Sequence, residues 1–273
     1  MPPYELAPPA ALRNIIKSLW YLGLDIGAGP ASLEVLPDGY VEIIFYFGGA
    51  GGLSVEASGL RLPSPFLTGL LDRPVQFEGS GRFEVLGIKC FPWAVTELLD
   101  LPGGPGGVQV VQHPIARLQA PLQALVQAGR VDEALAKVAQ YLLAARLGAA
   151  AGDPLLHQAG TAMREANGML PVHAVAAAAH ATVRTLERRF KQAAGHTVKD
   201  VLALMRFEQV RDHLCLDPAA SLAGLAHALG YADQSHLGRE FKRYSGTTPA
   251  AFARQVKRAQ QTVNRDFVAF VLT

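Results

Sequence analysis

The chain has 273 residues, of which 50% are hydrophobic and 18% are charged, and its formal net charge is +2. This composition is typical of a folded protein and excludes an intrinsically disordered chain, and the length favours two domains with a core each. No apolar run approaches the ~18 residues of a membrane span, and Met1–Glu5 lacks the basic and apolar pattern of a signal peptide. We therefore expect a cytoplasmic protein.

The charge is unequally divided along the chain. Residues 1–150 hold 10 Lys and Arg against 13 Asp and Glu, a net charge of −3, whereas residues 151–273 hold 15 against 10, a net charge of +5. A basic second half favours a polyanionic partner for that half alone. An ordinary solvated surface explains the same numbers, so charge by itself leaves both readings open.

The residue pattern of the first ~90 positions predicts short strands. Tyr40–Phe47 is β-branched and aromatic, and the turn residues Pro37–Gly39 introduce it. Gly, Pro and Asp signals separate the further expected strands, which are Leu53–Ala57, Pro65–Leu70, Val75–Glu78 and Arg82–Phe91. Strands at this spacing indicate an antiparallel sheet or barrel.

From Trp93 onward the apolar residues follow a helical period. The first expected helices are 93–99, 114–128 and 131–147. The small residues of 148–153 form the best domain boundary, because Asp153 can cap a new helix that starts with Pro154. The helices expected after it are 154–167, 172–179, 183–193, 198–214, 221–229, 234–244 and 249–260.

We therefore predict an α+β fold in two domains. A β-rich domain with helices covers 1–148, and an all-α domain with two helix-turn-helix units joined by a long helix covers 153–260. The tail 261–273 contains the apolar run Phe267–Leu272, which could pack on the body or pair with another chain.

The two units are predicted from an internal repeat. Thr185–Lys191 and His236–Lys242 lie 51 residues apart and are nearly the same. The pairs in register are Leu186 with Leu237, Arg188 with Arg239, Phe190 with Phe241, Lys191 with Lys242, Gly195 with Gly246 and Thr197 with Thr248. A repeat of this length predicts one structural unit built twice.

Each repeated helix has an apolar face and a basic face. In the first, Leu186, Phe190 and Ala193 share one side and Arg184, Arg188 and Lys191 share the other. In the second, Leu237, Phe241 and Tyr244 point inward and Gln234, Ser235, Arg239 and Arg243 point outward. Thr182 and Asp233 are the expected N-caps. A helix of this kind fits the DNA major groove, where Arg pairs with guanine and Gln with adenine.

The second unit carries a specific pattern. Gly230-Tyr231-Ala232-Asp233-Gln234-Ser235-His236-Leu237, followed by Arg239, Phe241, Lys242, Gly246, Pro249 and Phe252, resembles the signature of the AraC family of bacterial transcription regulators. The resemblance covers about residues 160–258. It implies binding to two successive major-groove segments of double-stranded DNA, with a homodimer and, for an activator, RNA polymerase as further partners.

The resemblance also implies the residues that meet DNA. The base-facing positions are Arg184, Thr185, Arg188, Gln234, Ser235, His236 and Arg239. Lys191, Lys242 and Arg243 fit phosphate contacts, and Lys257 and Arg258 do so too, although plain solubility explains these five equally well.

The first turn departs from the family pattern. His180 stands where Gly is usual in the family. We expect the first unit to be structurally looser or less sequence-specific than the second. Asn at position 180 should be tolerated, whereas a β-branched residue should not. In the second recognition helix Gly238 replaces the usual Ser, Thr or Cys, and a mid-helix glycine costs ~1 kcal/mol relative to Ala.

The sequence of the N-terminal half predicts a small-molecule pocket. Leu36–Phe45 and Leu86–Pro92 resemble the N-terminal domain of one AraC subgroup, which implies effector binding or dimerisation. The candidate ligand wall consists of Trp20, Tyr40, Glu42, Tyr46 and Trp93. Glu42 needs a cationic partner if it is buried, and the alternative is a strand end at which it meets water.

An enzyme in this half is disfavoured. Residues 1–150 contain a single histidine, His113, whereas a metal-dependent oxygenase needs two or three. Cys90 lies in an apolar strand and is expected to be an inert thiol. We expect no catalytic residue, cofactor or metal. The alternatives are a DNA-targeted enzyme and an adaptor that binds a protein partner through residues 1–150.

Overall fold

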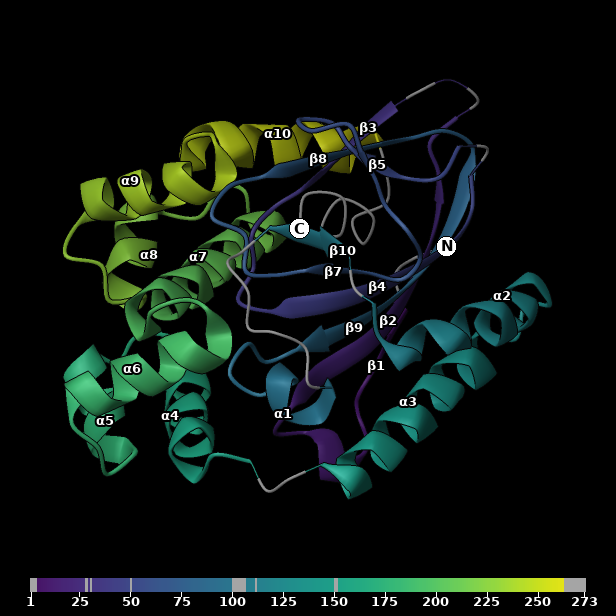
Figure 1. The fold of residues 1–273 in the computed structure, drawn as a ribbon. Helices are drawn as coiled ribbons and strands as arrows, with labels where there is room; N and C mark the ends of the chain where they lie inside the picture. Colours follow the sequence, from purple (N-terminus) through teal and green to yellow (C-terminus); the bar gives the residue numbers. More distant parts are fainter. Residues whose placement is uncertain are drawn as a thin grey trace.

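The computed structural model describes residues 4–27, 29, 31–49, 51–99, 107–110, 112–149 and 152–262. It has a β-rich half followed by a helical half, which confirms the predicted α+β class (Figure 1). The apolar run Phe267–Leu272 lies outside the described residues. None of the described helices is both long and apolar enough to cross a membrane.

The β-rich half contains two antiparallel sheets. The first has the strand order β1 (Tyr4–Leu6), β2 (Ile16–Asp25), β9 (Arg82–Cys90), β4 (Val41–Gly48), β7 (Phe66–Thr68) and β10 (Val108–Val110). The second has the order β3 (Ala31–Val35), β8 (Val75–Gly79), β5 (Ser54–Val55) and β6 (Leu60–Arg61). All the strand pairs in both sheets are antiparallel, as the spacing predicted.

The six-stranded sheet is covered on both faces. Ile43 and Phe45 of β4 point to a large core that includes residues of α1 (Val95–Leu99), α2 (Gln119–Gln127), α3 (Val131–Gly148) and two short 3-10 helices, η1 (Ala10–Leu12) and η2 (Pro114–Leu118). Ile44 on the same strand points to a second cluster, which Phe77 of the four-stranded sheet joins. The space between the two sheets is therefore lined by apolar side chains.

The helical half begins after α3. Its helices are α4 (Pro154–Glu165), α5 (Val172–Ala178), α6 (Val183–Ala194), α7 (Val198–Leu216), α8 (Leu222–Ala228), α9 (Gln234–Ser245) and α10 (Pro249–Thr262). Asp153 caps α4 through the amide of Leu155, and Thr197 with Asp200 forms a complete capping box on α7. The Asp153 cap is the one that the sequence predicted.

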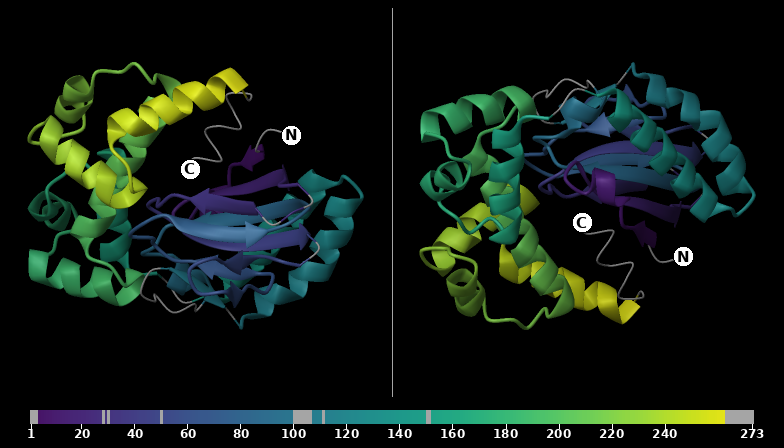
Figure 2. Two further views of the ribbon diagram at one scale, coloured as in Figure 1. Left: turned by 90° about the horizontal axis from the view of Figure 1, so that it is seen from above. Right: turned by 90° about the horizontal axis from the view of Figure 1, so that it is seen from below.

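The two halves lie side by side and share one core. In both views of Figure 2 the helical half lies on one side of the sheets, and α2 and α3 lie on the other. Trp93 connects the halves: it stacks on Phe91 with ring centroids 5.1 Å apart and meets Phe190 of α6 at 5.8 Å. Gly160 lets α4 pack directly against the indole of Trp93, because a Cβ at position 160 would lie only 2.2 Å from that ring.

Candidate DNA-binding surface and interior cavity

Helices α5 and α6 form one helix-turn-helix unit, and α8 and α9 form a second. In the first turn the amide of Ala181 donates to the carbonyl of Ala176, and in the second the amide of Tyr231 donates to that of Ala226, at 2.9 Å in both cases. The turns of the two units are therefore closed by equivalent backbone hydrogen bonds. They follow each other along the chain and are joined by α7 (Figure 1).

The turns differ at the residue with positive φ. Gly230 has φ = +72° and His180 has φ = +50°. A side chain in this left-handed region costs ~1–2 kcal/mol, whereas glycine adopts it freely. The first turn is therefore strained at the position where the sequence departs from the family pattern.

The recognition helices α6 and α9 begin and end alike. Thr182 Oγ1 accepts from the amide of Thr185 at 3.2 Å, and Asp233 Oδ1 accepts from that of His236 at 2.6 Å. Gly195 and Gly246 close the two helices, each with φ = +72°. The repeat in the sequence is thus a repeat of the N-cap, the buried face and the C-cap.

The apolar faces of both helices are buried, as predicted. Leu186 and Phe190 of α6 are fully buried. On α9, Phe241 and Tyr244 pack against Phe207 of α7, with ring centroids 5.0 and 5.3 Å away. This packing fixes the rotation of each recognition helix about its axis and so determines which residues face outward.

The opposite faces are exposed. Arg184, Arg188 and Arg239 make no hydrogen bond or ion pair with any residue that the structure describes. The other predicted DNA-contacting residues that are exposed are Lys191, Gln234, Ser235, Lys242 and Arg243. Five of these eight exposed residues belong to α9 and three to α6.

Two of the predicted base-facing residues are half-buried and engaged locally. The hydroxyl of Thr185 accepts from that of Thr182 at 3.0 Å. The ring of His236 packs edge-on against Tyr231, and its Nδ1 accepts from the amide of Ala232 at 3.4 Å. Both side chains therefore contribute to the geometry of their own turns.

Helix α7 is tied to the second unit by a half-buried arginine. Arg206 forms an ion pair with Glu240 of α9 at 3.2 Å and lies 5.4 Å from the ring centroid of Tyr231. Its guanidinium also donates to the carbonyl of Gly168 at 3.0 Å. Arg206 therefore links α7 to α9 and to the loop between α4 and α5.

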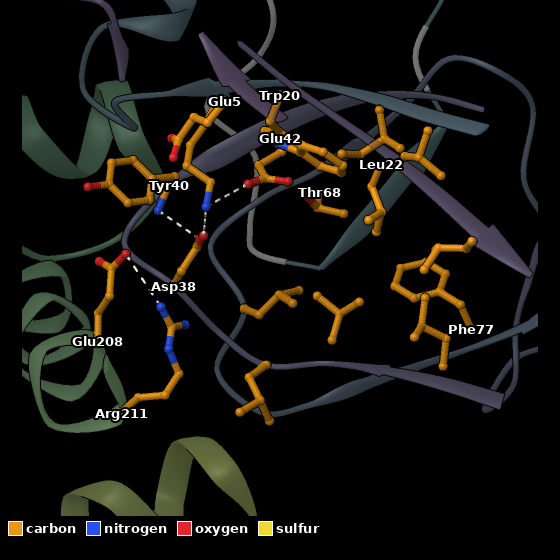
Figure 3. A pocket seen from close by; sticks show the side chains of 18 of the residues that line it. Glu5, Trp20, Leu22, Asp38, Tyr40, Glu42, Thr68, Phe77, Glu208 and Arg211 are labelled. Carbon is orange, nitrogen blue, oxygen red and sulfur yellow. Dashed lines mark hydrogen bonds and ion pairs between the residues drawn. The ribbon is translucent and has the colours of Figure 1, made fainter. Parts of the chain in front are cut away.

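A cavity of about 780 Å³ lies between the two sheets and extends to α7. Its apolar part is lined by Leu22, Leu24, Leu33, Val35, Ile44, Phe66, Phe77, Phe83 and Val85. Its polar part is bounded by Asp38, Glu42 and Lys89 from the β-rich half and by Glu208, Arg211 and Asp212 of α7. Figure 3 shows Asp38, Glu42, Glu208 and Arg211 at this end. The volume and the mainly apolar wall are those of a small-molecule site.

Lys89 is the centre of the polar part on the sheet side. Its Nζ lies 2.9 Å from Asp38 Oδ2 and 3.1 Å from Glu42 Oε1, and it approaches the Tyr40 ring to 5.2 Å. Burial raises the pKa of Glu42, and Lys89 opposes that rise. Burial disfavours the charge on Lys89, yet Asp38 and Glu42 hold the pKa of Lys89 well above its usual value. Lys89 is thus the cationic partner of Glu42 in this structure.

Arg211 is the corresponding group on the α7 side. Its side chain is only 4% exposed, and its Nη2 lies 2.9 Å from Asp212 Oδ1 and 3.7 Å from Glu208 Oε1. Its Nη1 has no hydrogen-bond partner among the described residues. Burial raises the pKa of Glu208 to about 7, although Arg211 acts in the opposite direction.

Three of the five predicted ligand-wall residues line this cavity, namely Trp20, Tyr40 and Glu42. Trp20 lies across Gly87, its partner in the sheet, where a Cβ would lie 2.1 Å from the indole. The other two residues are placed elsewhere. Tyr46 donates its hydroxyl to the carbonyl of Leu62 at 2.6 Å, and Trp93 is buried at the junction of the two halves.

The sequence reasoning missed Asp38, Lys89, Glu208 and Arg211. Lys89 carried a usable signal, because it is a lone charge in an apolar strand and stands directly opposite Glu42 in the sheet. Glu208 and Arg211 carried none, since α7 is about 120 residues away from these strands in sequence. Among the described residues, no group of three or more His, Cys, Asp or Glu could hold a metal ion.

Two capped helix-turn-helix units with exposed basic faces define the class of a DNA-binding protein. Residues 175–255 match a helix-turn-helix domain family, and residues 4–105 match a domain of unknown function, DUF6597. Residues 175–255 therefore form a helix-turn-helix DNA-binding domain of the AraC type.

Solved structures show weaker similarity. The crystal structure of ToxT from Vibrio cholerae O395 is 10% identical, with a TM-score of 0.46 over 87% of this chain and 97% of that chain. The DNA-binding domain of AdpA in complex with a target DNA is 25% identical, with a TM-score of 0.37 over 41% of this chain and 100% of that chain. A structure of ToxT from Vibrio cholerae strain SCE256 with unsaturated fatty acid bound is 9% identical, with a TM-score of 0.46 over 86% and 94%. None of the curated proteins matches this chain significantly.

Proposed function

We propose that this chain is a sequence-specific transcription regulator whose DNA binding is controlled by a small molecule bound in the cavity. One observation carries the proposal: the cavity wall is built jointly by the sheets of the β-rich half and by α7, the helix that joins the two DNA-binding units. A ligand there contacts both halves at once.

The proposed contacts to DNA are assigned from the side chains that are exposed on α6 and α9. Arg184 and Arg188 of the first unit, and Gln234, Ser235 and Arg239 of the second, face the base edges of two successive major-groove segments. Lys191, Lys242 and Arg243 contact phosphates. Thr185 and His236 remain proposed groove-facing positions, and they act in part by holding their turns.

The proposed control is a coupling between cavity and DNA. A ligand that contacts Glu208 or Arg211 of α7 favours one position of that helix relative to the sheets, and Arg206 passes this position to α9. Such coupling requires different ligand affinities for the DNA-competent state and the other state. Its usual magnitude is ~1–3 kcal/mol.

The proposal assigns binding rather than catalysis to the β-rich half. Cys90 is fully buried, and burial raises the pKa of its thiol, which disfavours the thiolate that nucleophilic catalysis requires. We place the sensor domain at 1–148 and the DNA-binding domain at 153–260. A second copy of the chain and, at an activated promoter, RNA polymerase are the further proposed partners.

Footprinting of the full-length chain on a DNA site selected from random sequence tests this function. We expect protection over about two helical turns, on one face of the duplex, at positions that match two successive major-groove segments. Protection of a single groove segment would contradict a two-unit reader. If the footprint is the same with and without every cavity ligand tested, the proposed control of DNA binding by the cavity is wrong.

A further inference from the structure

The polar part of the cavity holds more acidic than basic groups. Among the described lining residues the acidic ones are Glu5, Asp38, Glu42, Glu208 and Asp212, and the basic ones are Lys17, Lys89 and Arg211. Glu5 and Lys17 are exposed, and the Asp212 side chain is 48% exposed. Deeper in the cavity, the carboxyl groups of Asp38, Glu42 and Glu208 face the two cations Lys89 and Arg211.

Each of these two cations already contacts two carboxyl groups. Lys89 lies between Asp38 and Glu42, and Arg211 lies between Asp212 and Glu208. A buried carboxylate without a full counter-charge is destabilising. Burial raises the pKa values of Glu42 and Glu208, so the ionised form of each carboxyl group is disfavoured in the ligand-free protein. A positive charge on a bound molecule would offset this excess of carboxyl groups.

Arg211 gives an independent sign that this end of the cavity takes a ligand. The side chain is 96% buried and lies beside Glu208, which is also on α7, at the polar end of the cavity (Figure 3). Its Nη1 has no hydrogen-bond partner among the described residues, and a buried donor of this kind is costly to leave unpaired. An oxygen acceptor on a bound molecule would satisfy it.

The other end of the cavity is apolar and aromatic. Leu22 and Phe77 lie on opposite sheets and face the same space, away from Asp38 and Glu208 (Figure 3). Glu42, Trp20 and Thr68 lie between the two ends. An occupant that fills both parts therefore has a polar head at α7 and an apolar body between the sheets.

We propose that the effector of this chain is an amphipathic organic cation. Its protonated amine lies between Glu42 and Glu208, a neighbouring oxygen accepts from Arg211, and its apolar body lies between the two sheets. This assignment rests on the proposed function, in which the cavity is the effector site.

An anionic head group fits the same cavity less well. It would add a negative charge beside Asp38, Glu42 and Glu208, while Lys89 is already shared by two of them. The attraction of Arg211 for such a group is opposed by the neighbouring Asp212. The choice between cation and anion therefore depends on the excess of carboxyl groups.

Three probes with the same alkyl chain test the charge of the head: decylammonium, decanol and decanoate. Isothermal titration calorimetry on the full-length chain should give the order decylammonium, decanol, decanoate from tightest to weakest, with about tenfold or more between the first two. In two buffers of different ionisation enthalpy, decylammonium should release protons near pH 7, because it displaces a proton from Glu208. Tightest binding of decanoate, proton uptake, or no binding of any probe would overturn the inference.

Matched variants locate the contact. Glu42→Gln and Glu208→Gln should each weaken decylammonium about tenfold and leave decanol unchanged. Glu165→Gln, on an exposed position of α4, should leave both probes unchanged. Equal loss for decylammonium and decanol would mean that the variants only alter the shape of the cavity, and the head-group contact would then be wrong.

The experiment distinguishes two claims: that the ligand is a cation, and that the cavity controls DNA binding. DNA affinity is measured on the same samples with and without each probe. If decanol or decanoate changes DNA affinity and decylammonium does not, the effector site stands and the cationic head group is wrong. If decylammonium binds tightly and DNA affinity stays constant, the ligand class stands and control of DNA binding by the cavity is wrong.

Discussion

Replacing Glu208 by glutamine should make the ligand-free protein more stable at neutral pH and leave it unchanged in acid. Burial raises the pKa of this carboxyl group from 4.5 to about 7. The groups that face it are Arg211 and Asp212 on its own helix, Asp38 in the loop before β4, Lys89 of β9, and Tyr40. Glutamine keeps the shape and removes the ionisation.

The pKa difference sets the magnitude and the sign. Below pH 4.5 the group is protonated in both the folded and the unfolded state, so it contributes nothing. Between 4.5 and about 7 it ionises only in the unfolded state, so the folded protein loses stability as the pH rises. At 1.36 kcal/mol for each pKa unit, the loss is about 3 kcal/mol above pH 7.

Urea denaturation of the wild type, Glu208→Gln and Glu165→Gln across pH 4 to 8 measures this difference. The gain in unfolding free energy of Glu208→Gln over the wild type should grow from near zero at pH 4 to about 3 kcal/mol at pH 8. Glu165→Gln should show no such trend, because this residue is exposed. A difference that is constant across the range, or that shrinks as the pH rises, would refute the argument that burial destabilises the ionised carboxylate.

Three further predictions concern the DNA-binding half. His180→Val should destabilise the protein by about 1–2 kcal/mol relative to His180→Asn in urea denaturation, because position 180 has φ = +50°; equal stabilities would contradict the strain at this turn. Asp233→Ala removes the N-cap of α9 and should reduce stability by about 1 kcal/mol; Glu165→Ala is the control, since Glu165 is exposed and caps no helix, and an equal loss there would argue against the cap. Lys257→Ala should lower the slope of log affinity against log salt by about 1 for every DNA sequence, and a loss confined to one sequence would contradict a phosphate contact.

Much of the helical half was predictable from the sequence because its signals are local. The period of Leu186 and Phe190, the cap at Asp233 and the glycine at position 246 each act within one helix or turn. The same residues reveal the repeat, so the orientation of both recognition helices follows from their apolar faces alone. The left-handed conformation of His180 could be expected from the family resemblance, because glycine is usual at this position.

The β-rich half was less predictable because its sheets are covered on both faces. β2 was not expected, although it is the longest described strand, since Ile16–Asp25 has apolar residues facing both the helices and the second sheet. Its sequence therefore lacks the alternation that marks a half-buried strand. The strand Val41–Gly48 was marked by aromatic and β-branched side chains instead.

The ligand wall was partly predictable for a related reason. Aromatic residues such as Trp20 and Trp93 look alike in sequence, and only packing separates one that lines a cavity from one that joins two domains. The charged end of the cavity is formed by contact between distant segments. Glu42 could be singled out as a carboxylate in an apolar strand, but its neighbours on α7 could not.

The central claim is that two outward-facing helices read DNA, and Arg239 tests it most directly. It is exposed on α9, and it makes no ion pair with any described residue, so its removal should leave the fold intact. The measurement is the affinity of wild type and Arg239→Ala for the selected site and for every single-base substitution in it, at one salt concentration.

Arg239→Ala should lose about 1–3 kcal/mol of binding free energy on the selected site, and discrimination should disappear at one base position only. The matched variant Arg254→Ala, on the exposed face of α10, should retain discrimination at every position. If Arg239→Ala binds the selected site as tightly and as specifically as the wild type, the assignment of α9 as a reading helix is wrong.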